Sequence, residues 1–115
     1  MVWRSVRSIW LATACALGPT WAMADSAVPT EFRGANLRLG ERLIREHRCS
    51  ECHVRKVGGD GSAIYRPSGR ISRPAALLAM VELCSVELKL QLFPEDVQAV
   101  AGVLQRDHYR FKPGP

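Results

Sequence analysis

CSECH, at residues 49–53, is the stretch around which this chain is organised. Cys49 and Cys52 are three positions apart, and His53 follows directly. Thiolate and imidazole groups are strong nucleophiles and metal ligands. A charged, helix-like segment precedes the motif and a glycine-rich segment follows it. The motif is therefore predicted to lie where a helix ends and a loop begins.

The pattern C-x-x-C-H is the attachment signature of c-type haem. Two thiols at this spacing reach two vinyl groups on one edge of a porphyrin and form thioethers, and the adjacent imidazole then binds iron from the proximal side. We therefore predict one haem c, bound covalently through Cys49 and Cys52, with His53 as an iron ligand.

Three other kinds of site contain cysteines at this spacing. A thioredoxin-like site expects a preceding strand in a βαβ context, whereas a charged helical pattern precedes this motif. A zinc site needs a second pair of ligands, and none is suitably spaced. A structural disulfide between Cys49 and Cys52 would leave Cys84 alone. Haem attachment explains the motif and its context best.

Residues 1–24 have the features of a secretory signal peptide. Arg4 and Arg7 precede a short apolar stretch at 9–17, and small residues precede the expected cleavage site before Asp25. The apolar stretch is shorter than the roughly 20 residues of a membrane-spanning helix. We expect export to the periplasm and no transmembrane segment after cleavage.

The mature part, 25–115, is small and mildly basic. Of the chain's 16 Lys and Arg, Arg4 and Arg7 lie in the signal peptide, which leaves 14 against 11 Asp and Glu, a net charge of +3. This charge is too small to indicate nucleic-acid binding, but it suits an acidic redox partner. A chain of this size forms a marginal core, which a large apolar cofactor would complete.

Hydrophobic periodicity predicts an all-α single domain with three helices. These are expected at 36–48, about 75–84 and from 94 to about 105 or 109, with a loop at 57–73.

Two local features bear on these helices. Gly40 lies inside the first predicted helix, where glycine costs about 1 kcal/mol relative to alanine, so another helix is expected to cross closely there; Gly102 allows a similar approach in the last helix. Ser72 is the expected cap of the middle helix, with Pro74 in its first turn.

With these features the chain resembles the cytochrome c family. Residues 40–53 resemble the family's N-terminal helix and haem motif, and 94–109 resemble its C-terminal helix, which crosses the first; the resemblance covers 33–111. It implies a small cytochrome c-like fold of about three helices around one covalent haem. It also implies that His53 is the proximal ligand and that the role is electron transfer, not enzymatic catalysis.

The distal iron ligand has two candidates. In the family it is usually a Met in a loop before the last helix, but Met80, the one Met of the mature chain, falls inside a predicted helix. Cys84, an unpaired thiol in an oxidising compartment, is four residues later and shares the same helix face. This region resembles small monohaem cytochromes of which some have His/Cys ligation and bind gases. Others use an Asn just before that Cys, where this chain has Leu83.

These alternatives lead to different functions. Electron transfer in the periplasm is the leading prediction. A His/Cys-ligated protein that binds or senses nitric oxide or carbon monoxide is the second, and a haem subunit of a larger redox complex, as a hetero- or homodimer with 88–93 at the contact, is the third. Tyr65 and the arginines of 57–73 are candidates for pairing with haem propionates.

Overall fold

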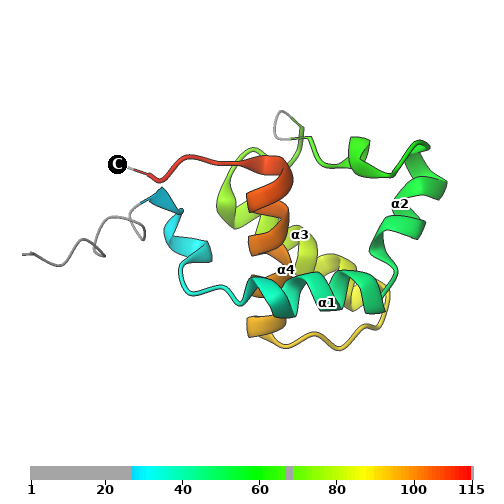
Figure 1. The fold of residues 1–115 in the computed structure, drawn as a ribbon, viewed down its shortest axis with the longest axis horizontal. Coiled ribbons are helices and arrows are strands. Elements are labelled where there is room, and N and C mark those ends of the chain that lie inside the picture. Colours follow the sequence, from blue (N-terminus) through cyan, green and yellow to red (C-terminus); the bar gives the residue numbers. More distant parts are fainter. Residues whose placement is uncertain (1–26, 67–68, 115) are drawn as a thin grey trace, which may run out of the picture.

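The computed structural model describes residues 27–66 and 69–114, so the predicted signal peptide at 1–24 lies outside the described residues. All regular structure in the described part is helical, without a strand, which confirms the all-α prediction. The elements, in chain order, are η3 (Thr30–Phe32), α1 (Leu37–Glu46), α2 (Cys49–Val57), η4 (Ser62–Ile64), α3 (Pro74–Glu87), α4 (Pro94–Leu104) and the π-helical η5 (Gln105–Tyr109) (Figure 1). Among the described helices, none is both long enough and apolar enough to cross a membrane.

The described residues form four α-helices where three were predicted, because the CSECH motif is itself helical. α1 ends at Glu46 and α2 begins at Cys49. Between them Arg48 has a left-handed backbone, with φ 51° and ψ 42°, a conformation that a right-handed helix does not contain. Its N–H donates back to the Arg45 carbonyl at 3.1 Å. The motif therefore opens a new helix in a new direction.

The start of α3 differs from its prediction. Arg73, and not Ser72, is the N-cap residue, and no side chain caps the helix. Pro74 takes the first helical position, where its fixed φ suits a helix and its missing N–H costs nothing. The predicted Ser72 cap is wrong because Pro74 alone is enough to set the boundary. α3 then continues to Glu87.

α4 is the centre of the fold. It begins at Pro94 as predicted, and the Asp96 carboxylate accepts the Phe93 N–H at 3.0 Å. α1 crosses α4 (Figure 1), and α3 and η3 also pack against α4. The main core is Phe32, Leu77, Val81, Val97, Val100, Ala101, Leu104 and Tyr109.

Gly40 sits at the crossing of α1 and α4. It is buried, and a Cβ added to it would lie within 2.6 Å of the Ala99 carbonyl carbon and 2.8 Å of Val103 Cγ2. At Gly102 a Cβ would lie 2.9 Å from the Ala35 Cβ. Both glycines therefore permit close backbone approach, as their positions inside helices predicted.

Apolar residues lie on several sides of α3, and α4 covers only one of these sides. Its buried stripe is Leu77, Val81 and Ser85. Met80 and Cys84 are half-buried on one flank of this stripe, and Leu78 and Val86 lie on the other. An apolar helix surface that the chain itself leaves uncovered is available to a cofactor or a partner.

Replacing Gly40 tests the helix crossing. Gly40→Ala is expected to lower the free energy of unfolding by roughly 1–3 kcal/mol, because forced separation of packed helices outweighs the helix-propensity gain. Urea denaturation followed by circular dichroism measures the change. Gly114→Ala is the control, since nothing lies within 4 Å of a Cβ there. A Gly40→Ala protein as stable as the parent would contradict the close crossing.

Candidate functional site

The two motif cysteines lie in the first turn of α2, with Cys49 as its first residue. Residues three apart on a helix are neighbours on one face, so the two thiols project from the same side. Both side chains are half-buried, and Cys49, Cys52 and Cys84 are all free thiols. The motif disulfide considered from sequence is thus not formed, and both sulfur atoms can react with a ligand.

α2 packs weakly against the rest of the chain. It contacts α1 and η4 and contains no buried residue, and Figure 1 shows it standing apart from the centre of the fold. Val54 and Val57 are 39% and 43% exposed. The two valines leave apolar surface on α2 that a bound group could cover. Covering it would stabilise α2, because most helical stability in proteins comes from packing an apolar face.

The His53 imidazole is held by a tyrosine. Its Nδ1 lies 2.8 Å from the Tyr65 hydroxyl, and the two rings meet edge to face at 83° with centroids 5.1 Å apart. A metal-binding histidine commonly hydrogen-bonds through the nitrogen that does not bind the metal, which sets its tautomer and ring orientation. With Nδ1 engaged, Nε2 is the nitrogen available to a metal.

A glycine brings this tyrosine close to α2. Gly61 is buried with φ +83°, and a Cβ there would lie 2.9 Å from the His53 Cβ. The Asp60 carboxylate accepts the N–H and the hydroxyl of Ser62 at 2.9 and 2.6 Å, which starts η4. Only glycine satisfies both the left-handed backbone and the close contact, so Gly61 places Tyr65 beside His53.

The C-terminal end of the chain supports Tyr65 from its other side. Its ring stacks on His108 with centroids 4.4 Å apart and planes at 27°. The turn carrying His108 is fixed by Gln105, whose side chain donates to the Phe111 carbonyl at 2.8 Å and accepts the Phe111 N–H at 3.0 Å. Tyr65 was considered from sequence only as a propionate partner. The pairing of Tyr65 with His53 depends on how the loop after α2 folds back onto that helix. The only feature of the sequence that points to this contact is an aromatic residue in a glycine-rich loop.

Cys84 lies within electrostatic reach of α2. Burial and the nearby Glu87 charge raise the pKa of the Cys84 thiol, the Lys56 charge lowers it, and Cys52 raises it. Lys56 and Cys52 both belong to α2. Cys84 is therefore close enough to α2 for charges on that helix to act on its thiol.

The pKa of the Cys49 thiol, like that of Cys84, lies above that of a free cysteine. Burial raises the pKa of Cys49 despite a backbone hydrogen bond that lowers it, and the charges of Cys84 and Cys52 raise it further.

The chain matches no family model, no curated protein and no solved structure in the comparisons made. In residues 27–66 and 69–114, no three His, Cys, Asp or Glu side chains are grouped to hold a metal ion, whereas a structural zinc site needs four ligands. The two grooves found in the described part of the chain are lined by other residues, not by Cys49, Cys52 or His53.

Acidification tests the surroundings of His53. Burial, and then the Lys56 charge, lower the pKa of its imidazole, so in the haem-free chain it should titrate below the ordinary value of about 6.5. The folded state then favours neutral His53. The contribution of this histidine to the free energy of unfolding is therefore fully present above pH 6.5, and it is lost as the pH falls from 6.5 through the lower pKa of the folded state. NMR titration measures the midpoint. Lys56→Gln should raise it, and Arg38→Gln, on α1, should leave it unchanged; a midpoint above 6.5 would contradict the burial.

Proposed function

We propose that this chain is a monohaem c-type cytochrome whose function is electron transfer. The observation that carries the proposal is the arrangement at the start of α2. Two free thiols share one helix face, and the next residue is an imidazole whose Nδ1 is already hydrogen-bonded by Tyr65. The crossing of α1 and α4 in an all-α chain supports a cytochrome c-like fold around the haem.

Each residue of the motif has a defined role. Cys49 and Cys52 would hold the haem, because each S–H bond would add across one vinyl group to give a thioether with no leaving group. His53 would bind iron through Nε2, while the Tyr65 hydroxyl holds the imidazole ring in place through Nδ1. Bound haem supplies an iron that alternates between ferric and ferrous states. No substrate bond is made or broken, so the chain is not an enzyme.

Cys84 and Met80 are the two candidates for a sixth iron ligand, and both are half-buried on one flank of α3. A Met thioether favours ferrous iron and a higher potential, whereas a thiolate stabilises ferric iron. Cys84 lies close enough to α2 for the Lys56 charge to act on its thiol. This proximity supports the second candidate function, a His/Cys-ligated protein that binds nitric oxide or carbon monoxide.

The surface around the motif suits a redox partner. Arg48, Arg55 and Lys56 are exposed on or beside α2. Positive charge near an exposed redox site speeds encounter with an acidic partner. Together with the predicted signal peptide at 1–24, this supports a periplasmic carrier that docks an acidic redox protein through its α2 face.

Covalent haem is the first test. The chain expressed with a periplasmic haem-attachment system should carry one haem that denaturation does not release, measured by intact mass and by the pyridine haemochrome spectrum. Cys49→Ser and Cys52→Ser should each shift that spectrum to the single-thioether form, and the double variant should lose covalent haem. Cys84→Ser, also a half-buried thiol, is the matched control and should keep it. A parent chain without covalent haem would overturn the proposal.

The distal ligand is tested by spectroscopy of the ferric holoprotein. If Cys84 binds iron, a thiolate-type low-spin EPR signal should disappear in Cys84→Ser and persist in Met80→Ala. Loss of a thioether charge-transfer band only in Met80→Ala would assign Met80 instead. Carbon monoxide and nitric oxide titration of the reduced protein then separates the functions, because a protein that binds neither is a carrier.

A further inference from the structure

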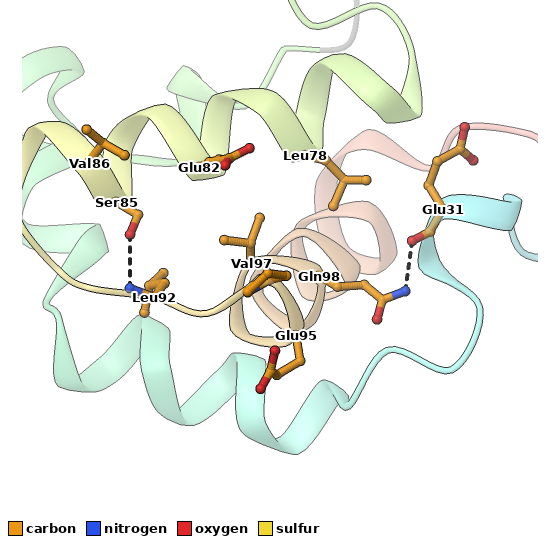
Figure 2. A pocket seen from close by; sticks show the side chains of 10 residues that line it. Glu31, Leu78, Glu82, Ser85, Val86, Leu92, Glu95, Val97 and Gln98 are labelled. Carbon is orange, nitrogen blue, oxygen red and sulfur yellow. Dashed lines mark hydrogen bonds between the residues drawn. The ribbon is translucent and has the colours of Figure 1, made fainter.

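A groove of about 530 Å³ runs between α3, the start of α4 and η3 (Figure 2). By helical spacing, its α3 residues Leu78 and Val86 lie on the flank opposite to Cys84. Its ten lining residues are Glu31, Leu78, Glu82, Ser85, Val86, Leu92, Pro94, Glu95, Val97 and Gln98. None of them belongs to the haem motif or to the residues that hold it. The groove is therefore a feature separate from the proposed function.

The walls of the groove are fixed by hydrogen bonds. The buried Ser85 hydroxyl accepts the Leu92 N–H at 3.2 Å, and the Leu90 N–H donates to the Ser85 carbonyl at 2.9 Å. Across the groove, the Gln98 amide donates to the Glu31 carbonyl at 3.0 Å (Figure 2). When the walls of a site are already ordered, binding of a ligand loses little conformational entropy.

Apolar surface lies exposed along this groove. Val86, in its lining, is 70% exposed, and Phe93, which directly precedes the lining residue Pro94, is 67% exposed. Leu78, Leu92 and Val97 add apolar atoms deeper in the groove. Large exposed apolar side chains with a polar rim mark surfaces that bind other proteins.

The charge of the groove is opposite to that of the whole chain. Glu31, Glu82 and Glu95 line it and none of its lining residues is basic, although the chain has a net charge of +5. In a symmetric dimer formed through this groove, the same carboxylates would face one another, and like charges across an interface are unfavourable. The occupant is therefore a different, positively charged molecule.

We infer that this groove binds a basic amphipathic segment of a partner protein. Apolar side chains of that segment pack against Val86 and Phe93, and its Lys or Arg side chains pair with the carboxylates of Glu82 and Glu95. The acidic groove contains no residue of α2, so this groove and the basic α2 face are two separate docking surfaces of opposite charge. Loss of haem binding would leave this inference intact.

The test uses the mature protein, isotope-labelled for NMR, and a synthetic amphipathic helix made of leucine and lysine. A leucine–glutamate peptide of the same pattern is the control ligand. The basic peptide should shift amide signals in the second half of α3 and the first turn of α4, with affinity that falls as salt rises. The acidic peptide should leave these signals unchanged.

Variants locate the interaction. Glu82→Gln and Glu95→Gln should each weaken binding about threefold, and Val86→Lys should weaken it more by adding a repulsive charge. Phe93→Ser removes the ring while placing a favoured residue at the N-cap of α4, so it should fold and bind less tightly. Glu46→Gln, an exposed carboxylate on α1, is the matched control and should bind as the parent does.

Three results would overturn the inference. The first is equal binding of the two peptides. The second is a set of shifted signals on α2 instead of α3 and α4. The third is concentration-dependent self-association of the parent that Val86→Lys abolishes, which would make a second copy of this chain the occupant.

Discussion

The close crossing of α1 and α4 is the contact on which the rest of the structure depends. It requires Gly40 on α1, where a side chain would meet the backbone at Ala99. With α1 fixed on α4, the left-handed turn at Arg48 sends α2 away from the core in a defined direction. The position of the cysteine motif is thus determined by a contact between two helices that do not contain it.

The candidate site is assembled from distant parts of the chain. α2 supplies the thiols and His53, the loop after it supplies Tyr65, and the C-terminal π turn supplies His108, which stacks on that tyrosine. Each part is held by local hydrogen bonds, yet α2 itself buries no residue. The proposed haem, a large apolar ring against α2 and α3, would bury surface that so short a chain leaves exposed, so it would contribute to the stability of the fold as well as to the function.

α3 has different neighbours on its different sides. Its buried stripe packs on α4, one flank carries Met80 and Cys84, and the other flank forms a wall of the acidic groove. Under the two proposals made above, haem binding and partner docking would use separate flanks of this helix.

The sequence by itself determined the helical class, the helix start at Pro94 and the close approach at Gly40, and the chemistry of Cys49, Cys52 and His53 is a prediction that rests on the sequence. These follow from periodicity, proline, glycine and residue spacing, which act locally. Only the tertiary structure decided that the motif begins a separate helix, that Tyr65 holds His53, and that Cys84 lies close to α2. Those outcomes depend on how a glycine-rich loop closes and how helices pack, and residues far apart in the chain acquire such contacts only when the whole fold brings them together.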